Sequence, residues 1–283
     1  MIDLHIHSTA SDGTLTPKEI VDLAIEKNIP AIAICDHEVA HGSIQAKKYS
    51  KNKNIEVISG IEIGCDDKEL NLFDIHIVGL YLDFKNKELN NLIKEMKKSR
   101  IKQKTKIIKK LNELGYDITF SELIKESDGG SFGRPHIARI LLRKYPELKS
   151  VSNIFDKLLG ENKPACVKQE KRTISEVIKI IKNANGIAIL AHPGLYNNHE
   201  QVIEKFIQAG GHGIEVLYPY GNRPDKLKEN SNNLTNTFSK LANKHNLLIS
   251  GGTDFHTKDD PEIGSHGITL EEFEILKKIK SNN

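Results

Sequence analysis

The sequence predicts an α/β fold. Short, continuously apolar segments alternate with amphipathic segments along most of the 283 residues. This alternation is typical of βαβ units and of parallel strands that are covered on both faces. Hydrophobic residues make up 38% of the chain, which is enough apolar surface to fill a large core. The length fits either about two ordinary domains or one large α/β barrel.

The expected strands and helices follow one another in a regular order. Residues 2–7 form the first strand, and Thr16-Pro17-Lys18-Glu19 is a capping box that opens a helix to about residue 26. Apolar runs predict six further strands, at residues 31–35, 55–63, 75–82, 187–191, 213–217 and 247–250. Thr269-Leu270-Glu271-Glu272 caps a last helix.

The stretch from about Glu88 to Lys168 interrupts this order. It has helical periodicity and almost no strand signal, and Gly129, Gly130 and Gly133 punctuate it. We therefore expect a helical insertion within an α/β domain. The expected divisions are a discontinuous α/β domain of residues 1–87 and 169–270, a helical insertion or cap of residues 88–168, and a C-terminal helix and tail of residues 271–283.

Composition argues against several classes of protein. The chain has 41 Lys and Arg against 38 Asp and Glu, a net charge of +3, which is not the strongly basic balance of a stable DNA-binding protein. No apolar run approaches the roughly 20 residues that cross a bilayer, and the N-terminus does not resemble a signal peptide. We expect a cytoplasmic protein with no membrane association. The three cysteines form no CxxC motif, which disfavours a disulfide framework or a thiolate zinc site.

Nearly every expected strand carries His, Asp or Glu at or near its C-terminal end. In α/β folds these ends form one rim, where active sites are built. Side chains at i and i+2 of a strand share a face, so the pair His5 and His7 and the pair Asp254 and His256 can each reach one metal ion. The other candidate ligands are Asp12, His37, Glu62, His76 and His192.

The types of candidate ligand narrow the chemistry. Histidine nitrogens and carboxylate oxygens without thiolates suit Mn²⁺, Fe²⁺ or Zn²⁺ in an open catalytic site. The candidates exceed the capacity of one ion, which implies two or three neighbouring ions with a bridging carboxylate. Such ions generate hydroxide at neutral pH, so the sequence predicts metal-assisted hydrolysis of a phosphate ester. The Gly-rich stretches lack the Lys-Ser/Thr of a nucleotide P-loop.

These motifs, in this order, resemble those of the polymerase and histidinol phosphatase (PHP) family from residue 1 to about 270. They are His5-x-His7, Ser11-Asp12-Gly13, Pro17-x-Glu19, Asp36-His37, Gly60-Ile61-Glu62, His76, Ala191-His192-Pro193 and Gly252-Thr253-Asp254-Phe255-His256. Phe132-Gly133-Arg134-Pro135-His136-Ile137-Ala138 resembles the subgroup of nucleoside 3′,5′-bisphosphate phosphatases and 5′-to-3′ exoribonucleases. The resemblance implies a distorted seven-stranded (β/α) barrel with a mainly helical insertion and a trinuclear metal site.

The resemblance also implies how the ligands are divided among three divalent ions, with Mn²⁺ expected and Fe²⁺ or Zn²⁺ as alternatives. His5, His7, Glu62 and Asp254 would hold the first ion, Glu62 with His76 and His192 the second, and Asp12, His37 and His256 the third. Every position carries a competent ligand type, which argues against a metal-free member. Asp36 and Asp74 would either orient imidazoles or cap strand ends.

Arginine is scarce, with six residues against 35 lysines. The arginine fork grips phosphate bidentately, and Arg134 lies beside His136 in the insertion. Arg100 on the preceding helix could reach the same anion, and the resemblance places substrate phosphate contacts in both segments. Alternatively, Arg100 belongs to a solvated face with Lys97, Lys98, Lys102, Lys104, Lys106, Lys109 and Lys110. Tyr218 and Arg223 follow the sixth strand and could also touch substrate.

The sequence thus predicts a metal-dependent phosphoesterase in which a metal-bridging hydroxide attacks phosphorus, with no separate catalytic side chain assigned. Arg134, assisted by Arg100 and His136, would bind phosphate. The partners would be nucleoside 3′,5′-bisphosphates or the 5′ ends of short RNA. The alternatives are a histidinol-phosphatase-like enzyme for small metabolites and a non-catalytic, polymerase-associated module. The long insertion argues against the first, and the complete ligand set against the second.

Overall fold

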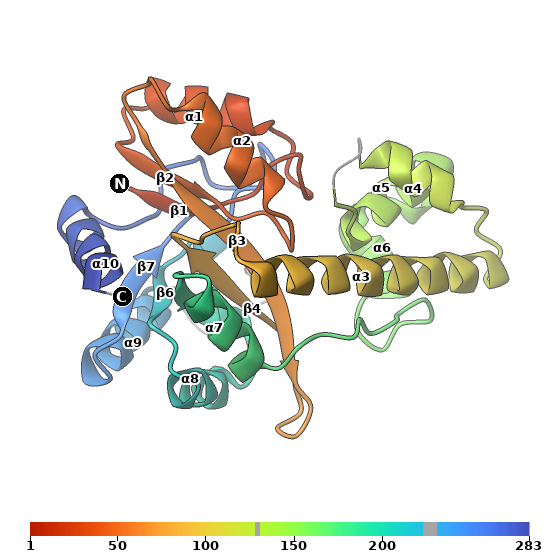
Figure 1. Ribbon diagram of the computed structural model, residues 1–283. Helices are drawn as coiled ribbons and strands as arrows, with labels where there is room; N and C mark the ends of the chain where they lie inside the picture. Colours follow the sequence, from red (N-terminus) through yellow and green to blue (C-terminus); the bar gives the residue numbers. More distant parts are fainter. Residues whose placement is uncertain (128–130, 223–230, 283) are drawn as a thin grey trace.

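A seven-stranded sheet forms the centre of the molecule in the computed structural model, which describes residues 1–127, 131–222 and 231–282 (Figure 1). All seven expected strands are present, and they pair in chain order. They are β1 (Asp3–Ile6), β2 (Ala31–Ile34), β3 (Glu56–Asp67), β4 (Leu72–Leu80), β5 (Ile187–Leu190), β6 (Gly213–Leu217) and β7 (Leu248–Gly251). The α/β class predicted from the sequence is therefore confirmed.

The strand directions differ in one respect from the expected pattern. β1, β2 and β3 are parallel, as are β5, β6 and β7, but β4 is antiparallel to both of its neighbours. β3 also continues beyond Glu62 to Asp67, and His76 lies within β4, opposite Gly64. The expectation that the third strand ends near Glu62 is therefore wrong, and the expected fourth strand carries His76 in its middle.

The chain after β7 returns to the end of β1. The N–H of Asp254 donates to the carbonyl of His5 at 2.8 Å, and the N–H of His7 donates to the carbonyl of Phe255 at 2.9 Å. Ile6 and Phe255 form a parallel bridge. These bonds bring the last pair of candidate ligands, Asp254 and His256, beside the first pair, His5 and His7.

Six helices lie around this sheet (Figure 1): α1 (Pro17–Glu26), α2 (His41–Tyr49), α7 (Ile174–Asn183), α8 (His199–Gln208), α9 (Ser231–Lys244) and α10 (Leu270–Asn282). Both predicted capping boxes are present, because the N–H of Thr16 donates to Glu19 and that of Thr269 to Glu272, each at 2.7 Å. Apolar faces of these helices pack on the strands, as Ile20 of α1 does in one cluster with Ile32. This packing fixes the strand ends that carry the site.

The stretch of residues 88–168, which interrupts the alternation of strands and helices, contains helices and, in its described residues, no strand. They are α3 (Lys87–Glu113), α4 (Phe120–Glu126), α5 (Arg134–Lys144) and α6 (Val151–Ile154), with a 3₁₀ turn at Pro146–Leu148 and a π-helical turn at Phe155–Leu159. Further 3₁₀ turns lie at Pro193–Leu195 and Tyr220–Asn222. Figure 1 shows α3 running from the sheet to α4, α5 and α6. Gly129, Gly130 and Arg223 lie outside the described residues.

Two apolar cores meet along α3. Its first turns contribute Leu89, Leu92 and Met96 to the core under the sheet. Its later turns contribute Ile107 and Leu111 to a separate core that is shared with α4, α5 and α6. None of the described helices is both long and apolar enough to cross a membrane.

Candidate metal centre

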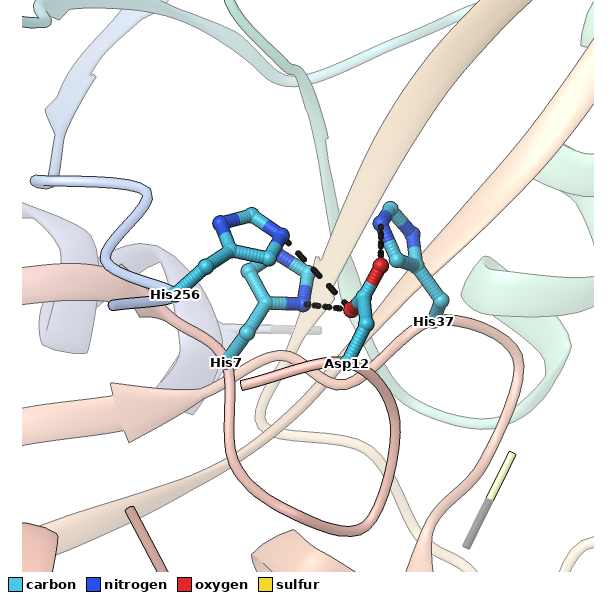
Figure 2. A group of neighbouring side chains, drawn as sticks. All are labelled: His7, Asp12, His37 and His256. Carbon is cyan, nitrogen blue, oxygen red and sulfur yellow. Dashed lines mark ion pairs between the residues drawn. The ribbon is translucent and has the colours of Figure 1, made fainter. Parts of the chain in front are cut away.

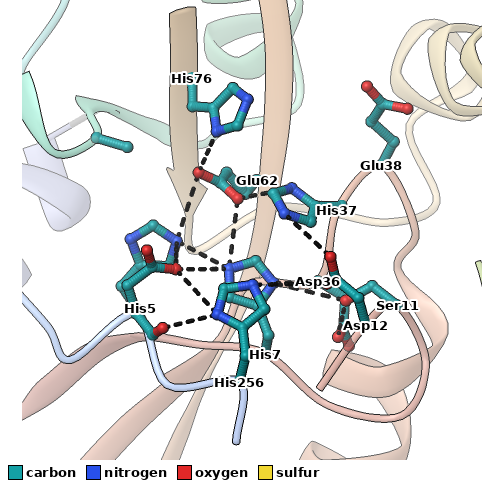
Figure 3. Close-up of polar contacts among 12 residues, drawn as sticks. His5, His7, Ser11, Asp12, Asp36, His37, Glu38, Glu62, His76 and His256 are labelled. Carbon is teal, nitrogen blue, oxygen red and sulfur yellow. Dashed lines mark hydrogen bonds and ion pairs between the residues drawn. The ribbon is translucent and has the colours of Figure 1, made fainter. Parts of the chain in front are cut away.

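All nine predicted metal ligands gather in one cluster at the edge of the sheet, and Figure 3 labels each of them except His192 and Asp254. The histidine rings of the cluster lie close to one another, with centroids 4.1 Å apart for His7 and His256 and 5.3 Å apart for His76 and His192. The cluster combines side chains from β1, β3, β4 and the segments that follow β1, β2, β5 and β7. The members are His5, His7, Asp12, His37, Glu62, His76, His192, Asp254 and His256.

Glu62 lies at the middle of this cluster and is fully buried. Its Oε1 lies 2.9 Å from Nδ1 of His76 and 3.1 Å from Nε2 of His192. Its Oε2 lies 2.7 Å from Nδ1 of His37 and 3.4 Å from Nε2 of His7. One carboxylate thus faces imidazoles on both of its oxygens, which is the arrangement needed to bridge two ions.

Three subsets of the cluster place their ligand atoms within 4.8 Å of one another. One subset joins His5, His7 and Asp254, and another joins His37, Glu62 and His76. The third is shown in Figure 2 and joins His7, Asp12, His37 and His256. Each subset has the spacing of a site for one metal ion. Together they contain the shared residues His7 and His37, so the three positions are contiguous.

Oδ1 of Asp12 is a buried carboxylate oxygen of the cluster that accepts no hydrogen bond from any described residue. The histidine nitrogens near Asp12 Oδ1 are 3.9 Å away at His7 and 3.6 Å away at His256. A buried carboxylate oxygen without a donor carries a desolvation cost that a cation would remove. The residues therefore fit divalent metal ions.

The pKa values of the candidate ligands indicate which of them carry a proton before a metal ion binds. Burial, together with repulsion from His256 and His37, lowers the pKa of His7 to about 3, so its imidazole is neutral. Burial acts to raise the pKa of Asp12, but His37 and His256 hold it well below its usual range. Burial acts to lower the pKa of His76, but Glu62 and Asp74 raise it to about 10. His76 would therefore release a proton when a metal ion binds.

Glu215 is a functional residue that the sequence reasoning missed. This buried residue of β6 accepts a hydrogen bond from Nδ1 of His5 at 2.9 Å, and its other oxygen accepts one from the N–H of His192 at 2.7 Å. A carboxylate on Nδ1 directs Nε2 of His5 toward the cluster. The signal was a single acidic residue inside the apolar run Gly213–Leu217.

Asp3 is a second such residue, and it lies inside β1. Its carboxylate accepts hydrogen bonds from the N–H and hydroxyl of Thr253, at 3.0 and 2.7 Å, and from the N–H of Gly264 at 3.0 Å. Burial raises the pKa of Asp3 to about 6. These bonds hold the segment after β7 that carries Asp254.

Asp36 and Asp74, which were expected either to orient imidazoles or to cap strand ends, make different contacts. Asp36 accepts bonds of 2.7 Å from the N–H and hydroxyl of Ser8 and from the hydroxyl of Ser11, so it holds the loop that carries Asp12. Asp36 therefore caps a loop and has no direct contact with an imidazole among the described residues. Asp74 does contact one, because its Oδ1 lies 3.6 Å from Nε2 of His76.

A cleft of about 800 Å³ opens from the cluster. Its walls include Glu62, His76 and His192 from the cluster, and Arg100, Lys104 and Arg134 from α3 and α5. The helical stretch therefore faces the candidate metal centre across this cleft. Tyr218 lies beside the cluster and donates a hydrogen bond to Asp254 at 3.0 Å.

The predicted substrate residues lie in three different environments. Arg134 lines the cleft, and its guanidinium lies 3.4 Å from Asp74. Arg100 also lines the cleft, but it is paired with buried Glu38 and donates to Ser131 at 2.6 Å, so it does not belong to a solvated face. His136 is buried, and its Nδ1 accepts the N–H of Gly133 at 3.1 Å at the start of α5.

Comparison with known proteins identifies a family model, two relatives and a solved structure that each match most of this chain. A family model described as "PHP domain" matches residues 3–216. The 5′-3′ exoribonuclease of Haemophilus influenzae is 34% identical over 261 residues, which cover 90% of this chain and 89% of the relative. The 3′,5′-nucleoside bisphosphate phosphatase of Chromobacterium violaceum is 30% identical over 260 residues, 90% of this chain and 87% of the relative. A solved structure of an amidohydrolase from Chromobacterium violaceum, with bound sulfate and no metal, has a TM-score of 0.84 at 28% identity and covers 98% of this chain and 96% of its own.

Proposed function

This chain belongs to the PHP domain family, and from that premise we propose that it is a metal-dependent phosphoesterase acting on nucleotides. Its proposed substrates are nucleoside 3′,5′-bisphosphates, the 5′ ends of short RNA, or both. Two relatives that span nearly the whole chain are named for these activities. The observation that carries the proposal is a buried cluster of histidines and carboxylates that opens into a cleft lined by arginine and lysine.

We propose three divalent ions at the cluster, with Mn²⁺ first and Fe²⁺ or Zn²⁺ as alternatives. The proposed ligands are His5, His7, Glu62 and Asp254 for the first ion, Glu62, His76 and His192 for the second, and Asp12, His37 and His256 for the third. Nitrogen and carboxylate donors without thiolates support this choice of metals. The buried oxygen Oδ1 of Asp12, which accepts no hydrogen bond from described residues, supports it too. When bound, such ions activate a water and neutralise charge on phosphoryl oxygens.

The protein side chains around the cluster hold the ligands in place. Glu215 fixes the ring of His5, and Asp74 contacts the ring of His76. Asp36 fixes the loop of Asp12, and Asp3 fixes the segment of Asp254. This shell of hydrogen bonds keeps the ligand atoms in their arrangement before metal binds, which lowers the cost of assembling the centre.

We propose that Arg134 contacts a phosphate group of the substrate. Its guanidinium lines the cleft, and its contact with Asp74, at 3.4 Å, is longer than a usual charge-assisted hydrogen bond. Arg100 would add positive charge while its own N–H groups hold Glu38 and Ser131. His136 would position Gly133 and the start of α5.

The proposed architecture is a distorted seven-stranded barrel with residues 88–168 as a helical cap over its active site. The bonds between β1 and the chain after β7 support the barrel. The separate apolar core of α4, α5 and α6 supports the cap. A cationic cap suits a nucleotide better than a small metabolite that carries a single phosphate, and the full ligand set favours an enzyme over a non-catalytic module.

A substrate panel tests this function directly. The Mn²⁺-loaded protein is given a nucleoside 3′,5′-bisphosphate, a short 5′-phosphorylated RNA, histidinol phosphate and p-nitrophenyl phosphate, and the released phosphate and nucleotides are measured. We expect kcat/KM for one of the two nucleotide substrates to exceed that for histidinol phosphate at least about tenfold. Equal or faster hydrolysis of histidinol phosphate would overturn the substrate assignment, and a fully loaded protein without any hydrolysis would overturn the activity.

A further inference from the structure

Lys104 is a buried lysine that α3 turns into the cleft. Only 4% of its surface is exposed, whereas Lys102 and Lys106 on the same helix are exposed. Lys104 is also among the residues that line the cleft. The expectation that it belongs to a solvated, lysine-rich face is therefore wrong. A lysine that is taken out of water normally has a buried counter-charge, so its partners decide what it does.

The three cations whose charges act on Lys104 each have a carboxylate partner. Arg100 pairs with Glu38, while Arg134 and Lys171 both pair with Asp74. Lys104 has no carboxylate within ion-pair distance among the described residues. The positive charges of Arg100, Arg134 and Lys171 act on it, against the more distant negative charge of Glu38, which is paired with Arg100. Lys104 is thus a buried cation among cations, with no direct carboxylate partner in the described part of the chain.

Lys104 is nevertheless held in place. Its Nζ donates to Oε1 of Gln103 at 2.5 Å, and Nε2 of Gln103 donates to the carbonyl of Val167 at 2.6 Å. Val167 follows the last helical turn of the stretch, Phe155–Leu159, and also lines the cleft. This chain of hydrogen bonds uses one of the three donors of the ammonium group. The other two have no partner among the residues that the structure describes, and they are available to a group that enters the cleft.

We propose that Lys104 binds the phosphate group of the substrate that is not hydrolysed, and so gives this enzyme its preference for doubly phosphorylated nucleotides. The inference rests on the proposed function and adds a specificity-determining residue to it. A phosphate that enters the cleft would supply the missing counter-charge and accept the free N–H donors, with Arg134 beside it. Burial and the neighbouring cations hold the pKa of Lys104 well below its usual range, and an anion would reverse that effect.

The test compares Lys104→Met with Lys106→Met, which removes the same charge from an exposed position of the same helix. The substrates are a nucleoside 3′,5′-bisphosphate, the two corresponding monophosphates and p-nitrophenyl phosphate, all with Mn²⁺-loaded protein. For Lys104→Met we expect the ratio of kcat/KM for the bisphosphate over the better monophosphate to fall roughly 10- to 100-fold. The rate on p-nitrophenyl phosphate and the metal content should stay at the parent level, and Lys106→Met should match the parent.

A structural role for Lys104 predicts a different result. Methionine would then lower the Tm and reduce all activities together, whereas we expect an unchanged or higher Tm because an uncompensated buried charge is removed. Lys104→Gln, which keeps a polar group, is the second variant if the first does not fold. An unchanged preference ratio in either folded, metal-loaded variant would overturn the role of Lys104. Failure of the parent protein to hydrolyse any nucleotide would instead overturn the proposed function itself.

Discussion

At the scale of single residues, Glu62 lies at the middle of the candidate metal centre. Its two oxygens face His37 and His76 at 2.7 and 2.9 Å, and further histidines lie just beyond. Burial acts to raise its pKa, but the surrounding histidines hold it well below its usual range. The carboxylate is therefore ionised and lies between two of the three metal subsets. A neutral group at this position would weaken two sites at once.

Replacement of Glu62 by glutamine tests that position. Glu62→Gln keeps the size of the side chain but removes the charge and one anionic oxygen. We expect metal content to fall by one to two ions per chain and turnover of a nucleoside bisphosphate to fall at least about 100-fold. Elemental analysis and steady-state kinetics measure the two effects. Exposed Glu69 offers the matched control as Glu69→Gln, and full metal occupancy in an active Glu62→Gln protein would contradict the bridging role.

The nine candidate ligands could be found from the sequence because each follows or interrupts a recognisable apolar run. His5 and His7 share one face of a strand by their spacing alone. Glu62 is recognisable because it is the acidic residue of the apolar run that forms β3. Glu215 and Asp3 could not be found in this way, because an acidic residue inside a strand shows its partner only in three dimensions. The sequence pattern also placed Lys104 on a solvated face, whereas it is buried. The sequence of a lysine-rich helix does not show which lysine faces inward.

At the scale of elements, the positions of the strands were predictable and the direction of β4 was not. An apolar run has the same pattern in either direction, so the pattern contains no sign that β4 is antiparallel to β3 and β5. The reversed strand has a consequence for the site. It pairs His76 with Gly64, within the hairpin rather than at its end, and brings the ring of His76 beside Glu62.

The start of α5 shows how an element fixes one wall of the cleft. Gly133 precedes the helix, and its N–H donates to the neutral Nδ1 of buried His136 at 3.1 Å. Burial, with the nearby charge of Arg139, lowers the pKa of His136 from 6.5 to about 4. Protonation of Nδ1 would remove this acceptor, so the bond and the low pKa have a common origin.

This titration predicts how stability depends on pH. Because the pKa of His136 is lower in the folded state than in the unfolded state, the unfolded state binds more protons between pH 6.5 and about 4. The contribution is complete above pH 6.5 and is lost as the pH falls toward 4. His136→Gln keeps an acceptor for Gly133 but does not titrate. Between pH 7 and pH 5 we expect the parent to lose about 2 kcal/mol more free energy of unfolding than this variant.

Urea unfolding of both metal-free proteins at several pH values measures this difference. The metal ligands are common to both proteins, so their titration cancels in the comparison. His245, which lies at the surface, provides a control as His245→Gln, and it should follow the parent at every pH. A constant difference between the parent and His136→Gln across this range would show that His136 does not titrate as we expect.

At the scale of the whole molecule, the helical stretch can be separated from the sheet at a defined place. All nine candidate ligands lie outside residues 101–168, and α4, α5 and α6 pack on their own core. The first turns of α3 must be kept, because Leu89, Leu92 and Met96 belong to the core under the sheet. The hydroxyl of Ser99 donates to the carbonyl of Glu170 at 2.8 Å, so the two ends of the stretch are already adjacent.

Replacement of residues 101–168 by a short Gly/Ser linker therefore tests whether the helical stretch is the recognition element. Arg100 is retained, so that buried Glu38 keeps its partner. The ends to be joined are in contact, and closing a short linker between them costs little entropy. We expect metal content to stay near the parent level and hydrolysis of p-nitrophenyl phosphate to survive in part, since the ligand cluster is intact. The ratio of kcat/KM for a nucleoside bisphosphate over p-nitrophenyl phosphate should fall at least about 100-fold, because the contacts of Arg134 and Lys104 are lost together and each charge-assisted hydrogen bond contributes roughly 1.5–3 kcal/mol. An unchanged ratio in a folded, metal-loaded deletion would mean that nucleotides are recognised by the rim of the sheet, and the cationic cleft would then have another role.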